Sequence, residues 1–158
     1  MKVSLDKTKI LKIAVIGGKN ANVKDCDIAY NLGEKIAERG HILLCGGRSG
    51  LMAAASKGAY DSGGMTVGIL PGEDSSDANK WIKLSLPTGV GLARNSIIAC
   101  SCDGAVAING EFGTLSEIAY CKQFGRPVCT LNSWEIKNVH QVNNVDEAIN
   151  YIEQECDQ

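Results

Sequence analysis

Hydrophobic residues follow two patterns along this chain. Short apolar runs, with the length and composition of buried β-strands, alternate with segments whose apolar residues are spaced as on one face of a helix. The runs predict strands at Lys12–Ile16, His41–Cys45, Met65–Leu70, Ala105–Ile108 and Pro127–Leu131, with shorter strands at Trp81–Leu86 and near Val139–Val142. The spaced segments predict helices at Lys24–Arg39, Leu51–Ala59, Leu92–Cys102 and Thr114–Phe124, and a last helix from Asn144 to about Glu155.

Strands therefore alternate with helices from one end of the chain to the other. This order predicts a layered α/β fold with a mainly parallel sheet and right-handed crossovers. Two helix starts carry the capping-box pattern, Thr114-x-x-Glu117 and Asn144-x-x-Glu147, in which the first side chain caps the helix and the glutamate reaches back. No repeat, low-complexity segment or linker interrupts the order, so residues 1–158 are expected to form a single domain.

The composition is that of an ordinary globular protein. Of the 158 residues, 44% are hydrophobic and 22% are charged, and the formal net charge is −2. No block of lysine and arginine favours a nucleic-acid groove, and no apolar run approaches the roughly 20 residues that a membrane span needs. No export signal is visible at the N-terminus, so we expect a cytoplasmic protein without nucleic-acid or membrane partners.

The seven cysteines are expected to be reduced thiols, several of them buried as small hydrophobic residues. Their number is odd, and most lie inside apolar strand or helix patterns. The only close pair is Cys100 and Cys102, and neither His41 nor His140 adds a second pair. Because paired ligands at short spacing are typical of zinc sites, no metal site is predicted.

Three glycine-bearing turns each follow a predicted strand. Because the carboxyl ends of parallel strands share one edge of a sheet, these turns are expected to lie together. Glycine lets the backbone approach a ligand closely, and free N–H groups at a helix start bind anions. None of the turns matches a strict dinucleotide or P-loop motif, and a glycine at such a turn is often only geometry. Together they predict a site for a phosphorylated, nucleotide-like ligand, with Gly17, Gly18, Gly46, Gly47, Arg48, Ser49, Gly50, Gly110, Gly113 and Thr114 as candidate binding residues.

Arg94 and Glu117 are the candidate catalytic residues. An arginine near a helix start suits two-pronged binding of phosphate, although it can equally be a surface side chain lying over the core. Ser49 and Thr114 are helix-start hydroxyls whose ordinary role is capping, and capping is also the alternative role for Glu117. No nucleophile–histidine motif is visible, and His41 at a strand start is expected to be structural. An arginine and a carboxylate beside a phosphate suit cleavage through an oxocarbenium-like sugar.

Two segments resemble a known family. GGRSGLM at Gly46–Met52 is similar to a GGG-x-x-GLM motif, and NGEFGTLSE at Asn109–Glu117 is similar to a PGG-x-GT-x-x-E motif. Both motifs are those of the Lonely Guy (LOG) family of cytokinin riboside 5′-monophosphate phosphoribohydrolases, and the resemblance covers roughly Lys12–Leu131. It implies a Rossmann-like three-layer sandwich, usually dimeric, that hydrolyses a nucleoside monophosphate to base and ribose 5-phosphate without metal or organic cofactor. Arg94 and Glu117 fall where the family has its catalytic arginine and glutamate.

Three residues depart from the family motifs. Asn109 stands where the family has proline, Glu111 where it has a second glycine, and Asn95 where a lysine follows the arginine. A carboxylate in a phosphate cradle repels the phosphate unless it points away. The Ala93-Arg94-Asn95 segment resembles more closely a sister group that includes the molybdenum cofactor carrier proteins, which bind a phosphorylated pterin without cutting a bond. Asn95 is therefore also a candidate ligand-binding residue.

Two main hypotheses follow. The first is a phosphoribohydrolase acting on AMP-like nucleotides through Arg94 and Glu117, and the alternative is a non-catalytic carrier of molybdenum cofactor or a related phosphorylated ligand. A third and weaker one is that the glycine edge is vestigial and the protein acts by association. No cofactor is required in the first hypothesis, whereas a bound nucleotide or molybdenum cofactor is expected in the second. The resemblance implies a homodimer or higher homo-oligomer. Tyr120 and Phe124, at i,i+4 spacing on the predicted helix, lie either on a dimer face or in the core.

Overall fold

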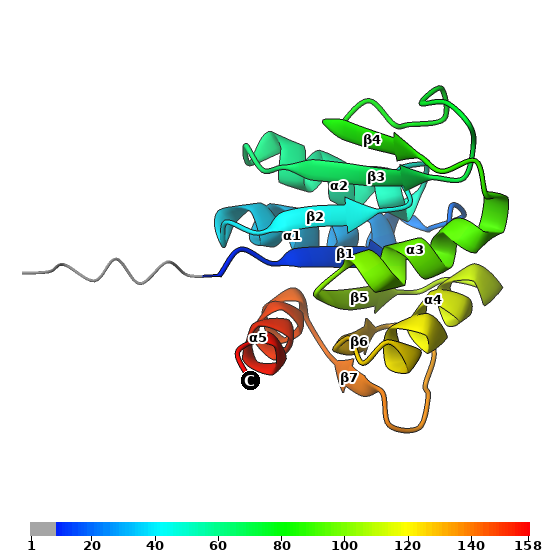
Figure 1. The fold of residues 1–158 in the computed structure, drawn as a ribbon. Coiled ribbons are helices and arrows are strands. Elements are labelled where there is room, and N and C mark those ends of the chain that lie inside the picture. Colours follow the sequence, from blue (N-terminus) through cyan, green and yellow to red (C-terminus); the bar gives the residue numbers. More distant parts are fainter. Residues whose placement is uncertain (1–8) are drawn as a thin grey trace, which may run out of the picture.

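The computed structural model describes residues 9–158, and its centre is one sheet of seven parallel strands. The strand order is β4-β3-β2-β1-β5-β6-β7, so the chain order reverses beside β1 (Figure 1). In such Rossmann-like sheets, ligands bind outside the carboxyl ends of the strands at the reversal. The strands are β1 Lys12–Ile16, β2 Ile42–Cys45, β3 Thr66–Leu70, β4 Leu84–Pro87, β5 Gly104–Ile108, β6 Val128–Leu131 and β7 His140–Val142.

Five helices, α1 to α5, cover the two faces of this sheet in the described residues, as Figure 1 shows for α3 and α4 in front of it. Side chains of β1 alternate between the faces, so Ile13 and Val15 belong to one core and Ala14 and Ile16 to the other. The core on the α1, α2 and α5 face is separate from the core under α3 and α4. The helices are α1 Val23–Glu38, α2 Leu51–Asp61, α3 Arg94–Ser101, α4 Phe112–Gln123 and α5 Val145–Cys156.

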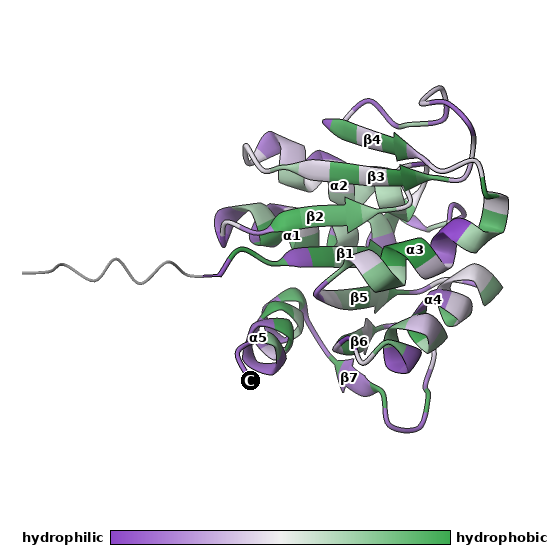
Figure 2. Ribbon diagram, in the orientation of Figure 1, coloured by the Kyte–Doolittle hydropathy of each residue, from purple (hydrophilic) through white to green (hydrophobic). Residues whose placement is uncertain are grey.

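The central strands are apolar on both sides, which is why they appear as near-continuous green ribbons in Figure 2. All five residues of β5 are buried, whereas edge strand β4 is largely exposed. Helix α5 shows the opposite character, with Ile149 and Ile152 buried and polar residues on its outer side. The predicted α/β fold with a parallel sheet is confirmed, and the Rossmann-like resemblance with it.

Helices α1 and α2 touch through their backbones. A Cβ atom on Gly33 of α1 would lie 2.0 Å from the Ala55 carbonyl oxygen, and one on Gly58 of α2 would lie 2.0 Å from the Tyr30 carbonyl oxygen. The alanine-rich sequence of α2 permits this approach. The contact fixes the amino end of α2 beside the carboxyl edge of the sheet.

Several predicted boundaries are wrong by a few residues. β4 begins at Leu84, because the Asn79 side chain accepts a hydrogen bond from the Trp81 N–H (3.1 Å) and turns the chain there. A short 3₁₀ turn, η1 at Gly91–Ala93, precedes α3, so the expected single helix is divided. In residues 9–158, no helix has the length and apolar character needed to cross a membrane. The prediction that the chain carries no export signal rests partly on residues 1–8, which lie outside the residues that the structure describes.

The predicted capping pattern is present at α5, except that its glutamate bonds the residue before the cap, and it is absent at α4. At α5, the Asn144 side chain accepts from the Glu147 N–H (2.9 Å), and Glu147 in turn accepts from the Asn143 N–H (2.8 Å). At α4, the prediction is wrong, because the helix already begins at Phe112 and its N-cap, Glu111, makes no side-chain capping bond. Thr114 and Glu117 are buried instead.

The structure also decides the roles of other singled-out side chains. His41 is structural, since its Nδ1 accepts from the Leu11 N–H (3.1 Å) and its Nε2 lies 3.0 Å from Glu153 Oε1. Tyr120 and Phe124 stack at 6.1 Å between ring centroids but are 39% and 40% exposed, so they are not core residues. All seven cysteines are free thiols, and four are buried, namely Cys45, Cys102, Cys121 and Cys129.

Candidate functional site

A cleft of about 200 Å³ lies at the carboxyl edge of the sheet, where the loops after β1, β2 and β5 meet. We call it the glycine-edge cleft. It brings together eight of the predicted site residues with four that were not predicted. The predicted ones are Gly17, Gly18, Arg48, Arg94, Asn95, Gly113, Thr114 and Glu117, and the others are Lys19, Met52, Leu92 and Glu111.

The remaining predicted glycines and Ser49 do not line the cleft. Gly50 has φ +70°, and a Cβ there would lie 2.3 Å from the Lys19 carbonyl oxygen. Gly110 has φ +105°, and a Cβ there would meet the Thr114 side chain. Gly50 thus lets the loop after β2 pack on the loop after β1. A Cβ on Gly46 would meet the Arg94 and Met52 side chains, and one on Gly47 would meet Leu70 and Gly68 of β3. The N-cap of α2 is Gly50, without a side-chain bond, so the capping role expected for Ser49 is wrong.

Arg94 joins α3 to the strand ends. Its side chain is 8% exposed, and Nη1 donates to the carbonyl oxygens of Gly46 (2.6 Å) and Ile69 (2.7 Å). Its Nε donates to Asn95 Oδ1 (2.9 Å). Arg94 is therefore not a surface side chain lying over the core. Among the described residues Nη2 has no hydrogen-bond acceptor, so this nitrogen is available to a ligand in the cleft.

Glu117 lies in the same cleft with an unpartnered carboxyl group. Its side chain is 9% exposed, and within residues 9–158 it accepts no hydrogen bond and forms no ion pair. Burial raises the pKa of this carboxyl to about 8, although the charge of Arg94 lowers it. Burial likewise lowers the pKa of the Arg94 guanidinium, while Glu117 opposes that change. Arg94 and Glu117 therefore influence each other's pKa through their charges, but they form neither a hydrogen bond nor an ion pair.

The loop after β5 takes a conformation that the family motif proline cannot adopt. Asn109 has φ +47°, whereas the φ of proline is fixed at about −65°. Its Nδ2 donates to Asp25 Oδ2 (2.6 Å), and Nδ2 of Asn132, which has φ +51°, donates to Asp25 Oδ1 (3.2 Å). Asp25 is fully buried at the start of α1. One carboxylate thus holds the ends of β5 and β6, and with them the loop that leads to α4.

Glu111, which stands where the Lonely Guy motif has a glycine, adds a negative charge to the cleft. It is exposed at the cleft and serves as N-cap of α4, and its carbonyl oxygen accepts from Trp134 Nε1 (3.2 Å). Lys19 and Arg48 lie on the opposite loops of the same cleft. The backbone before α2 is held by Asn79, whose Nδ2 donates to the Arg48 carbonyl oxygen (2.9 Å). Lys19 was findable from sequence, since it directly follows the first glycine pair.

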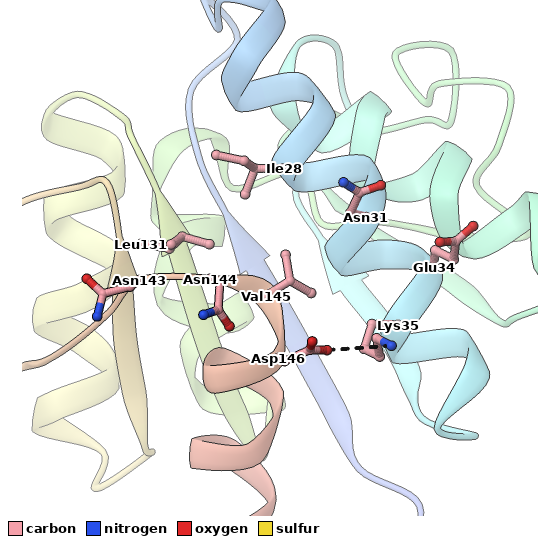
Figure 3. A pocket seen from close by; sticks show the side chains of 9 residues that line it. All are labelled: Ile28, Asn31, Glu34, Lys35, Leu131, Asn143, Asn144, Val145 and Asp146. Atoms are coloured by element: carbon pink, nitrogen blue, oxygen red, sulfur yellow. Dashed lines mark ion pairs between the residues drawn. The ribbon is translucent and has the colours of Figure 1, made fainter.

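A second cavity, of about 400 Å³, lies between α1 and the start of α5 (Figure 3). It contains none of the predicted site residues, and the Lys35–Asp146 ion pair (3.5 Å) crosses it. Asn31 and Asn144 add polar groups to its wall. Within residues 9–158, no three His, Cys, Asp or Glu side chains are grouped as a metal ion would need. The glycine-edge cleft is therefore the better candidate, because cations and helix starts converge there.

Comparison with known proteins places the chain in a family. The sequence profile of the SLOG cluster4 family matches residues 10–157. The chain belongs to the SLOG cluster4 family. This SLOG protein is 38% identical to an uncharacterised protein of Archaeoglobus fulgidus, over 90% of its own length and 95% of the other's.

Two solved structures are similar to this SLOG protein over almost all of it. One is the molybdenum cofactor binding protein of the phototrophic bacterium Rippkaea orientalis, with a TM-score of 0.87, 32% identity, and coverage of 92% of this chain and 97% of that one. The other is the molybdenum cofactor carrier protein of Chlamydomonas reinhardtii, also with a TM-score of 0.87 and 32% identity, covering 95% and 100%. The resemblance to the subgroup of cofactor carriers, drawn from the motifs, is confirmed.

Proposed function

We propose that this protein is a non-catalytic carrier that binds molybdenum cofactor, or a closely related phosphorylated ligand, in the glycine-edge cleft. The observation that carries the proposal is the convergence of Lys19, Arg48 and Arg94 on one cleft at the reversal of strand order. Anions bind at such positions because the charges and the free N–H groups at a helix start both favour them. The names of the two similar solved structures support molybdenum cofactor as the ligand.

The residues of the cleft fit the phosphate end of such a ligand. Arg94 Nη2 and the side chains of Lys19 and Arg48 supply donors, and Gly17, Gly18 and Gly113 line the cleft without side chains of their own. A volume of about 200 Å³ is small for a whole cofactor, since sites for drug-sized ligands measure roughly 300–1,000 Å³. The rest of the ligand would lie over the sheet edge, beside Leu92 and Phe112, which are 85% and 80% exposed.

The phosphoribohydrolase hypothesis uses the same cleft, because Arg94 and Glu117 both line it. The comparisons do not support hydrolysis, and they favour the carrier alternative. Two of the Arg94 nitrogens are also committed to Gly46, Ile69 and Asn95, which suits a structural role more than movement with a substrate. Carrying the cofactor without cutting a bond is therefore the function that we propose.

The test is binding of molybdenum cofactor, released anaerobically from a molybdoenzyme, measured by ultrafiltration. Arg48→Ala is the informative variant, because no Arg48 side-chain bond exists within residues 9–158 that its loss would break. Losing one charged contact to phosphate is expected to weaken binding about tenfold. Lys137→Ala removes the same charge from an exposed loop and is expected to leave binding unchanged.

Chromatography of AMP incubated with the protein tests the hydrolase hypothesis in parallel. The carrier proposal predicts no free adenine. Release of base that disappears in Glu117→Gln would contradict the proposal, as would cofactor binding that Arg48→Ala and Lys137→Ala weaken equally.

A further inference from the structure

Glu117 has a carboxyl group for which the carrier function, as proposed so far, has no use. It is nine-tenths buried, lines the glycine-edge cleft, and has no hydrogen-bond partner in residues 9–158. An ionised carboxylate is stable in a protein interior only when cations or N–H groups compensate its charge. Within residues 9–158, no such group forms a hydrogen bond or an ion pair with Glu117.

Arg94 is the nearest cation to consider, and its geometry explains why it does not neutralise Glu117. Its Nη1 is held by the carbonyl oxygens of Gly46 and Ile69, and its Nε by Asn95. No ion pair to Glu117 forms within 4.0 Å. The other charged or titratable groups around Glu117 are Lys19 and Arg48 across the cleft, Cys45 on β2, and Glu111 and Cys121 on its own helix.

We propose that Glu117 meets the ligand as a neutral carboxylic acid, whose O–H donates a hydrogen bond to a phosphate or carbonyl oxygen of the bound molecule. This inference rests on the proposed function and names a contact of the same site. An ionised Glu117 would repel an anionic ligand, whereas a protonated one adds a donor to those of Lys19, Arg48 and Arg94. The glycine-edge cleft thereby becomes a binding site that loses affinity as the pH rises.

The raised pKa of Glu117 agrees with this geometry and sets the pH range. With a pKa of about 8, roughly nine-tenths of the carboxyl is protonated at pH 7 and roughly one-tenth at pH 9. If only the protonated form binds, the dissociation constant rises about tenfold between these two pH values. An anion bound beside Glu117 would favour the neutral form further.

Two measurements test the proposal. The first is a carbon-13 NMR titration of the Glu117 side-chain carboxyl in the free protein, assigned with Glu117→Gln; a midpoint near 8 is expected, and a midpoint near the ordinary 4.5 would overturn the proposal. The second is ultrafiltration with molybdenum cofactor at pH 7, 8 and 9. Wild type is expected to lose about tenfold in affinity across this range.

Glu117→Gln is the matched control, because its amide keeps an N–H donor and does not titrate. Its affinity is expected to change less than about twofold between pH 7 and pH 9, in contrast to the loss of about tenfold in wild type, whereas Glu117→Ala is expected to bind weakly throughout. A flat wild-type profile, or a folded Glu117→Gln that no longer binds, would overturn the proposal. A carboxyl midpoint near 8 combined with no cofactor binding at any pH would contradict the proposed function, and the ligand contact with it.

Discussion

Introducing the proline of the Lonely Guy motif at position 109 is expected to destabilise this protein. Asn109 has φ +47°, and a proline, with φ fixed at about −65°, cannot follow that path, so the loop must rearrange at a cost of about 3 kcal/mol, the upper end for a disfavoured backbone conformation. The substitution also removes the N–H that donates to the Asn132 carbonyl oxygen (3.0 Å), worth about 1 kcal/mol.

The larger local consequence falls on Asp25. Loss of the Asn109 side chain removes the shorter of its two amide contacts (2.6 Å) and leaves a fully buried carboxylate with Asn132 alone. An under-satisfied buried charge costs about 2–3 kcal/mol. The three terms sum to about 6 kcal/mol, which is comparable to the whole stability of an ordinary domain, about 5–15 kcal/mol.

Urea unfolding followed by circular dichroism measures these terms separately. Asn109→Gly keeps the positive φ and the N–H but loses the side-chain bond, and Asn109→Ala adds about 1 kcal/mol of left-handed strain. The expected order of stability is wild type, Gly, Ala, then Pro, with the proline variant largely unfolded. A proline variant within 1 kcal/mol of wild type, or one more stable than the glycine variant, would refute the reasoning about Asp25 and the loop.

Three further predictions concern burial and close packing. The folded protein holds a proton on Glu117 (pKa about 8) that the unfolded chain releases near 4.5, so the free energy of unfolding of wild type falls as the pH rises through this range. Relative to wild type, Glu117→Gln is therefore expected to become more stable by a few kcal/mol between pH 5 and 9 in urea titrations. A difference in stability that does not change with pH would contradict this prediction. Gly58→Ala improves helix propensity by about 1 kcal/mol but forces its Cβ to 2.0 Å from the Tyr30 carbonyl oxygen, so net destabilisation by about 2–3 kcal/mol is expected in thermal unfolding, and a stabilised variant would refute the contact. Arg94→Lys keeps the charge, but the lysine ammonium lies one bond short of the position of Nη1 and has no counterpart of the Nε that donates to Asn95, so a loss of about 2–3 kcal/mol is expected by the same assay, and wild-type stability would exclude the structural role.

The sheet could be predicted from sequence because its central strands are buried on both faces and are therefore continuous apolar runs. The start of α4 could not be predicted in the same way. Its first turn contains Gly113 and the exposed Phe112, which look like part of a turn, so the helix was expected to begin at Thr114. With the helix start placed at Thr114, Glu117 falls at the position of a capping glutamate, whereas in the structure it is buried.

The site was predictable as a set of loops but not as a set of contacts. The glycine turns and the family motifs located Arg48, Arg94 and Glu117 at one edge. Asp25 gave no signal, because an acidic residue in the first turn of a helix is common, and its partners Asn109 and Asn132 lie 84 and 107 residues away along the chain. Only the fold brings these three side chains together.

Binding of a phosphorylated ligand in the glycine-edge cleft can be observed in a crystal structure of the protein with molybdenum cofactor, in which molybdenum is located by anomalous scattering. We expect the metal beside the carboxyl ends of β1 and β5, with the cofactor's phosphate within hydrogen-bond distance of Arg48 and Arg94. A cofactor bound instead in the cavity between α1 and α5, next to the Lys35–Asp146 pair, would show that the glycine-edge cleft is not the binding site.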